Sequence, residues 1–128
     1  MTSEEQRNLE RVALWAQTYN EDVERMVNEV YAEDCEVQNM STGHVVRGRE
    51  EFLALEREIE KQSPGRKVIV KRTVAAGNVV ALEAEGQFSG GVTLEGSVFL
   101  TFDSEGLIVN DRTYLSDPTG ALSPSSNS

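Results

Sequence analysis

Residues 66–115 read RKVIVKRTVAAGNVVALEAEGQFSGGVTLEGSVFLTFDSEGLIVNDRTYL, and this stretch decides the fold. It is rich in β-branched residues, and turn signals divide it at Gly77-Asn78, at Gly90-Gly91 and over 103–106. Such runs between tight turns are typical of antiparallel strands. We therefore predict four successive strands, over residues 66–76, 79–88, 92–102 and 107–115. Gly86 and Gly96 are positions where this long sheet can bend.

The sequence before this stretch is predicted to be mainly helical. Apolar residues recur at helical spacing over 4–19, 23–31 and 48–62, and Ser63-Pro64-Gly65 ends the last of these helices. Residues 35–40 alternate apolar and polar side chains, which predicts a short strand before the third helix. Helices followed by a meander indicate an α+β domain rather than alternating βαβ units.

A long twisted sheet has a concave face, and helices can cover this face without filling its widest end. We expect a cone-shaped domain in which a curved antiparallel sheet and three N-terminal helices enclose one apolar pocket for a small molecule. The single domain is expected over residues 1–117. Residues 118–128, rich in Pro and Ser, are expected to form a flexible tail.

Charge and composition exclude several classes of partner. The chain has 128 residues and a formal net charge of −10, and residues 1–62 carry 15 of its 22 acidic side chains. An anionic surface disfavours nucleic-acid and membrane partners. No leader segment or membrane-spanning run is recognised, so we expect a cytoplasmic location. Cys35 is the only cysteine and His44 the only histidine, so we expect a buried thiol, no metal site and no cofactor.

Four segments carry a resemblance to a known family. Residues 19–27 (YNEDVERMV), 31–37 (YAEDCEV) and 46–52 (VRGREEF) resemble nuclear-transport-factor-2-like proteins, and residues 106–114 (GLIVNDRTY) resemble the last strand of their SnoaL-like branch. The resemblance covers about residues 5–118. It implies a cone fold, an internal pocket and homodimerisation through the outer sheet face. Members include polyketide cyclases, ketosteroid isomerases, epoxide hydrolases, dehydratases and non-catalytic binding domains, so the fold alone does not determine function.

Two activities of the family lack their residues here. Ketosteroid isomerases need a carboxylate base and two proton donors, and the matching positions hold Asn39, Leu14 and Val98. Epoxide hydrolases of the limonene type use an Asp-Arg-Asp arrangement. The acid expected on the last strand falls at Thr113, and Arg112 beside it points to the opposite face.

Asp111 remains as the candidate catalytic residue. Strand alternation places it with Val109, Thr113 and Leu115, and by resemblance this face lines the cone; the other face holds Ile108, Asn110, Arg112 and Tyr114. Burial would raise the pKa of Asp111, which would suit a general acid or base, and SnoaL-type cyclases resemble this in using a pocket aspartate. The alternative is that the two faces of the strand are reversed, or that Asp111 has a structural role and pairs with a nearby base such as Arg72 or Arg112.

The candidate substrate-binding residues are Trp15, Tyr19, Tyr31, Asn39, Phe52, Val98 and Thr113. Asn39 is expected either to bind a ligand carbonyl or to satisfy local backbone groups. His44 is expected to be either solvated or catalytic. Phe88 and Phe99 are expected in the core, and the polar stripe of Glu83, Glu85, Glu95 and Ser97 is expected on the outer face.

Two functions stay open. The first is an acid/base enzyme of cyclase, isomerase or hydrolase type that needs no cofactor, acts on an apolar, ring-containing substrate and uses Asp111 as its proton carrier. The second is a non-catalytic ligand-binding or accessory domain, dimeric and with the same pocket.

Overall fold

The computed structural model describes residues 1–116, so the tail expected over 118–128 lies outside the described residues. The helical elements are α1 (Ser3–Glu21), α2 (Val23–Arg25), the π-helical turn η1 (Met26–Val30), α3 (Gly48–Gln62) and the 3₁₀ turn η2 (Ser89–Gly91). The strands are β1 (Tyr31–Asn39), β2 (His44–Arg47), β3 (Lys67–Ala76), β4 (Val79–Phe88), β5 (Val92–Phe102) and β6 (Ile108–Ser116). The predicted α+β order of helices before the main sheet is confirmed.

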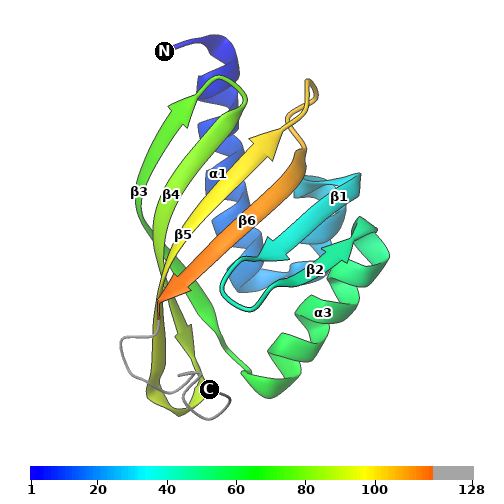
Figure 1. Ribbon diagram of the computed structural model, residues 1–128, viewed down its shortest axis with the longest axis vertical. Coiled ribbons are helices and arrows are strands. Elements are labelled where there is room, and N and C mark those ends of the chain that lie inside the picture. Colours follow the sequence, from blue (N-terminus) through cyan, green and yellow to red (C-terminus); the bar gives the residue numbers. More distant parts are fainter. Residues whose placement is uncertain (117–128) are drawn as a thin grey trace.

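All six strands form one curved sheet, in the order β2-β1-β6-β5-β4-β3 (Figure 1). The predicted meander is confirmed, because β3, β4, β5 and β6 pair antiparallel with their neighbours in chain order. β1 also pairs antiparallel with β2, but it lies parallel to β6. This parallel pair joins the N-terminal segment to the last strand and places Val37 opposite Asp111.

The helices cover the concave face of the sheet. The first of them, α1, begins at a capping box in which Thr2 and Glu5 bond each other's backbone amides, and it lies along β3 and β4. Helix α3 packs against β1 and β2, and Figure 1 shows it on the side of the cone away from β3. None of the helices within residues 1–116 is long and apolar enough to cross a membrane.

Core and cavity occupy opposite halves of the same strands. Toward one end Val80, Leu100 and Ile108 are completely buried, in the same core cluster as Val27 and Val30 of η1. Toward the other end Ala84, Leu94 and Thr113 line a cavity instead. The meander therefore supplies the core at one end and the walls of a site at the other.

Several boundaries differ from the prediction. The helix expected over 23–31 ends in the π-helical turn η1, and Tyr31 already belongs to β1. The strand expected over 35–40 therefore starts four residues earlier, because Tyr31 and Ala32 are buried in the sheet rather than on a helix face. Strand β2 was not predicted; its four residues pair with residues 36–39 of β1.

Two side-chain placements were also wrong. Phe99 was expected in the core but is 44% exposed, because it alternates with the inward-facing Val98 and Leu100. Ile108 was expected on the outer face but is completely buried. Opposite the step from Thr101 to Phe102 of β5, β6 carries one extra residue. Before Asn110 this bulge reverses which alternate side chains of β6 face inward.

Candidate functional site

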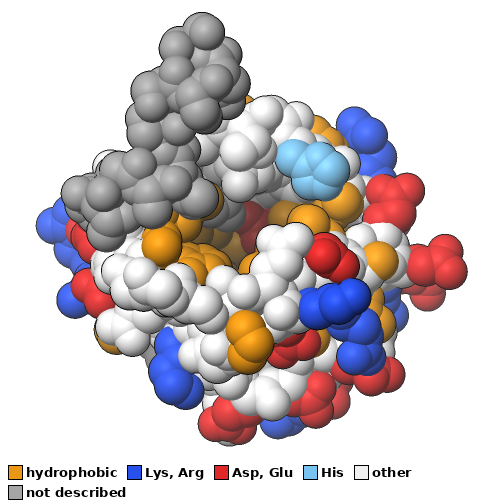
Figure 2. All heavy atoms as spheres, turned by 90° about the horizontal axis from the view of Figure 1, so that it is seen from below, with side chains coloured by type: hydrophobic (Ala, Val, Ile, Leu, Met, Phe, Trp, Pro, Cys, Tyr) orange, Lys and Arg blue, Asp and Glu red, His pale blue; other side chains and the backbone are white. Residues whose placement is uncertain are grey.

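A cavity of about 190 Å³ lies at the wide end of the cone, between the sheet and helices α1 and α3. It opens to solvent, and Figure 2 shows the mouth as a hollow edged largely by apolar side chains. The apolar and aromatic residues of the wall come from eight elements, and they include Trp15, Tyr19, Met26, Tyr31, Val37, Phe52, Leu55, Ile59, Val68, Phe88, Leu94, Val98 and Leu115. A small number of polar groups interrupts this wall.

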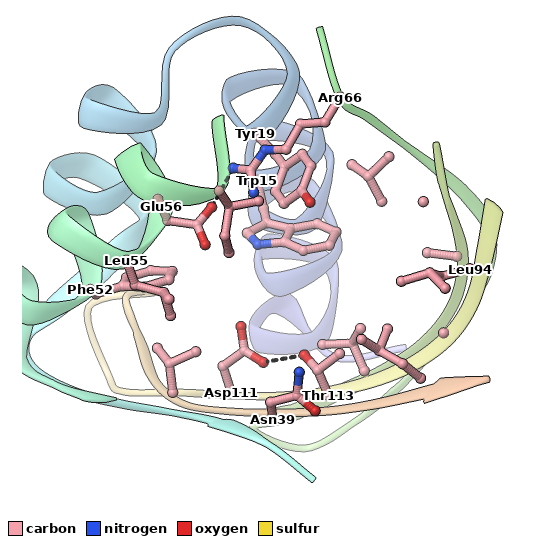
Figure 3. Close-up of a pocket in the computed structure, with 18 of the residues that line it drawn as sticks. Trp15, Tyr19, Asn39, Phe52, Leu55, Glu56, Arg66, Leu94, Asp111 and Thr113 are labelled. Carbon is pink, nitrogen blue, oxygen red and sulfur yellow. Dashed lines mark hydrogen bonds and ion pairs between the residues drawn. The ribbon is translucent and has the colours of Figure 1, made fainter. Parts of the chain in front are cut away.

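Asp111 is one of these polar groups and is deeply buried. It lies on β6 beyond the bulge, is only 4% exposed, and points from the sheet into the cavity (Figure 3). The Tyr31 hydroxyl donates to its Oδ2 at 2.6 Å, and the Thr113 hydroxyl donates to its Oδ1 at 2.8 Å. Trp15 Nε1 in turn donates to the Tyr31 oxygen at 3.0 Å. The carboxylate is therefore fixed by one donor on each oxygen.

Burial dominates the electrostatics of this carboxylate. Desolvation raises the pKa of Asp111 from 3.8 to about 6, although the hydrogen bonds from Tyr31 and Thr113 act in the opposite direction. The negative charge of Glu56 adds a smaller upward contribution to the same pKa. Burial and the neighbouring Asp111 also raise the pKa of Tyr31 well above its ordinary value, so Tyr31 remains a donor. A carboxyl group with a pKa near 6 can exchange a proton at neutral pH.

A second polar pair, Glu56 and Arg66, lines the same cavity (Figure 3). Glu56 comes from α3 and Arg66 from the segment before β3, and Arg66 Nη2 donates to Glu56 Oε1. The side chains are 8% and 3% exposed. The Arg66 guanidinium lies 4.1 Å from the centre of the Tyr19 ring. Burial raises the pKa of Glu56 more than Arg66 lowers it, and burial raises the pKa of Tyr19 to about 12.

Sequence reasoning did not place this pair in the site. Glu56 lies on the inner face of its helix beside Phe52 and Leu55, so a carboxylate within an apolar helical face was the available signal. Arg66 had no comparable signal, because it stands between a turn and a strand where a basic residue is ordinarily exposed.

All eight candidate residues from the sequence surround this one cavity: Trp15, Tyr19, Tyr31, Asn39, Phe52, Val98, Asp111 and Thr113. Asp111 pairs with two hydroxyl groups rather than with an arginine. Arg72 contacts Glu83 instead, at 3.0 Å, and Arg112 is exposed. Within residues 1–116 the pairing of Asp111 with Arg72 or Arg112 is thus not observed, and the catalytic role of Asp111 stays a prediction.

Asn39 and His44 line the cavity from the end of β1 and the start of β2. The Asn39 Oδ1 accepts from the backbone amides of Ser41 and Thr42, at 2.9 and 3.2 Å. Its side-chain carbonyl therefore holds the turn, while its amide group lies beside Thr113 in the cavity (Figure 3). Within residues 1–116, no three His, Cys, Asp or Glu side chains gather as a metal site would require.

Comparison with known proteins agrees with this architecture. The model of the SnoaL-like domain matches residues 12–110. No curated protein matches the sequence. Three solved structures illustrate the fold. A putative ketosteroid isomerase from Kribbella flavida DSM 17836 has a TM-score of 0.79 at 20% identity, over 89% of this chain and 81% of that one.

The second is a putative SnoaL-like polyketide cyclase from Jannaschia sp. CCS1, with a TM-score of 0.78 at 17% identity over 91% and 90% of the two chains. The third is an epoxide hydrolase from M. tuberculosis described as LEH-like, with a TM-score of 0.77 at 20% identity over 88% and 85%. At these identities the likeness concerns the fold.

Proposed function

Since the chain belongs to the SnoaL-like domain family, we propose that it binds a small apolar, ring-containing carbonyl compound and moves a proton on it without a cofactor. One observation carries the proposal: Asp111, buried in an otherwise apolar cavity, is held by Tyr31 and Thr113 and has a pKa raised to about 6. Structural ion pairs can perturb a pKa as well, but among residues 1–116 Asp111 has hydroxyl partners and no cationic one.

The proposed step starts with Asp111 ionised. Its carboxylate takes a proton from the carbon next to the ligand carbonyl, and the C–H electron pair forms the double bond of an enolate. Asn39 Nδ2 faces the same cavity and would donate to the enolate oxygen. Asp111 then returns the proton to the same carbon or to another carbon of a conjugated enolate. Alternatively, the enolate carbon attacks a second carbonyl of the ligand, the C=O π bond of that carbonyl breaks, and its oxygen takes the proton from Asp111. The first outcome is exchange or isomerisation, and the second is cyclisation.

The size of the cavity limits the ligand. A volume of about 190 Å³, filled to a packing density of roughly 0.74, takes about 140 Å³ of ligand, or about 10 to 12 non-hydrogen atoms. This corresponds to a molecule of two fused rings. The bicyclic ketone 2-tetralone is therefore a suitable probe, since its C1 protons are acidic.

The test is deuterium exchange at C1 of 2-tetralone in D₂O, followed by NMR, with wild type and Asp111→Asn. The substitution keeps the shape of the side chain, so affinity measured by calorimetry should change little. The exchange catalysed by the protein should fall roughly 100-fold or more. Equal rates in the two proteins would remove Asp111 from the reaction.

The alternative is a non-catalytic binding domain with the same pocket. Wild-type protein that binds 2-tetralone but leaves its exchange at the buffer rate would favour this role. The names of the solved relatives, an isomerase, a cyclase and a hydrolase, support acid/base chemistry as a class without choosing among its members.

We also propose that two copies of the chain associate through the outer face of the sheet, as the family resemblance implies. Phe99 and Tyr114 are 44% and 42% exposed there, with ring centres 6.0 Å apart in an edge-on arrangement. The ion pairs Lys71–Glu85 and Arg72–Glu83 join the neighbouring strands β3 and β4. An exposed aromatic pair bordered by charges is typical of a protein interface.

A further inference from the structure

Glu56 offers the cavity a hydrogen-bond acceptor that the proposed reaction does not use. Its Oε1 is bound by Arg66 Nη2, whereas among the described residues its Oε2 has no hydrogen-bond partner. Oε2 also keeps some solvent-accessible surface, unlike the unpaired side-chain atoms that are fully buried. Because the residue is only 6% exposed and lines the cavity, the accessible surface of this oxygen faces the cavity (Figure 3).

The position of this oxygen is fixed by its neighbours. Arg66 binds the other oxygen of Glu56, and Tyr19 packs against the Arg66 guanidinium at 4.1 Å. Glu56 belongs to α3 and Asp111 to β6, so the two carboxyl groups approach the cavity from the helical wall and from the sheet (Figure 3). A ligand that places one end against Asp111 can therefore reach Glu56 with another part.

Stability does not explain why this pair is buried. Removing two charges from water costs several kcal/mol, and replacing a buried ion pair by apolar side chains of similar volume is often neutral or stabilising. The remaining walls around Glu56, among them Phe52, Leu55 and Ile59, would accept an apolar pair. A contact between the ligand and this pair would explain its burial, which packing alone does not explain.

We infer that Glu56 Oε2 binds a hydroxyl group of the ligand, at a point on the ring system remote from the carbon that faces Asp111. This inference rests on the proposed function for the placement of the ligand. An ionised carboxylate only accepts hydrogen bonds, so its partner must be a donor. Arg66 balances the charge of Glu56, so this end of the cavity gives a cation no net attraction and favours a neutral donor. The substrate class is then a hydroxylated bicyclic ketone.

The test compares 2-tetralone with its 5-, 6- and 7-hydroxy derivatives by calorimetric titration. A hydrogen bond to a charged acceptor predicts that at least one hydroxy isomer binds wild type roughly tenfold or more tightly than the parent ketone. The double variant Glu56→Leu/Arg66→Met should lose this preference and bind all four compounds alike. Asp111→Asn serves as the control, because it should keep the preference.

A second variant protects the test against misfolding of the first. Urea unfolding followed through Trp15, the only tryptophan, reports whether the double variant folds. If it does not, Glu56→Gln keeps the side-chain shape and its contact with Arg66, and the preference should fall severalfold because the acceptor is neutral. Wild type without a preference for any isomer, including no binding by any of them at millimolar concentration, overturns the inference, as does a preference that survives both variants.

The result is separable from that of the proposed function. A hydroxyl preference that depends on Glu56, together with no catalysed exchange at C1, would leave the binding site in place and remove the enzyme. Catalysed exchange that depends on Asp111, together with no hydroxyl preference, would do the reverse.

Discussion

Replacing Asp111 by Asn should make the folded protein more stable relative to wild type at neutral pH than at acid pH. The pKa of Asp111 is about 6 in the folded protein, above its ordinary value of 3.8. The folded state therefore holds this proton more tightly than the unfolded chain does. Ionisation costs folding free energy in full above pH 6, and the cost disappears as the pH falls through 6 toward 3.8. Asn carries no charge and has no such dependence.

The magnitude follows from the difference between the two pKa values. Roughly 2 pH units correspond to about 3 kcal/mol of folding free energy at pH 7.5. At pH 5 the folded carboxyl is mostly protonated and the unfolded one is not, which leaves about half of this cost. The stability of Asp111→Asn minus that of wild type should thus be about 1–2 kcal/mol larger at pH 7.5 than at pH 5. Any fixed geometric cost of the amide cancels in this comparison.

The assay is urea unfolding of both proteins at the two pH values, read by Trp15 fluorescence. Asp34→Asn is the matched control, because Asp34 is an exposed aspartate on β1 and its loss removes one surface charge. A stability difference that is the same at both pH values, or larger at pH 5, would show that the Asp111 carboxyl is not held in a raised-pKa environment.

Three further predictions concern the surroundings of this group. Tyr31→Phe removes the hydrogen-bond donor to Asp111 and the acceptor for Trp15. It should therefore cost about 1–3 kcal/mol of stability and move the midpoint of the pH dependence upward. Tyr114→Phe, which alters an exposed hydroxyl, should do neither. Gly86→Ala places a Cβ 2.8 Å from the Phe88 ring at the cavity wall, so calorimetry should show weaker binding of 2-tetralone than for Gly96→Ala, whose Cβ meets its nearest neighbour at 3.4 Å. Light scattering at micromolar concentration should give twice the 14.1 kDa chain mass for wild type and the mass of one chain for Phe99→Asp/Tyr114→Asp. A wild-type mass of one chain would refute the dimer.

Local patterns were enough to predict the element types and most of the meander. Two-residue alternation grouped Asp111 and Thr113 on one face of β6, and the family resemblance indicated that this face lines the cone. The grouping holds because both residues lie beyond the bulge that reverses the alternation at Ile108. Alternation could not reveal the bulge itself, since an extra residue in a strand has no separate local signal. The short strand β2 was missed because four residues carry too little period to be recognised.

The partners of Asp111 could not be predicted in the same way. Tyr31 is 80 positions away in sequence, and it meets Asp111 only because β1 and β6 pair in parallel with their registers shifted between Tyr31 and Glu36. Periodicity describes a face of one element and says nothing about the register between distant strands. The eight candidate residues were found because each lies on an inward face, whereas the hydrogen bonds among them depend on tertiary pairing.

The parallel pairing of β1 with β6 also affects the order in which the strands of the sheet can pair during folding. Strands β3 to β6 can pair as successive local hairpins, but within the sheet β1 has only β2 and β6 beside it. The pairing of β1 with β6 closes a loop over residues 40–107. Closing this loop costs more entropy than closing a hairpin, and it slows folding. β6 is the last strand of the chain, and it lies between β1 and β5 in the sheet, so β1 and β2 can join the meander only when β6 is in place. A chain stopped before β6 would therefore lack both the carboxylate of Asp111 and the strand that joins β1 to β5 in the cavity wall.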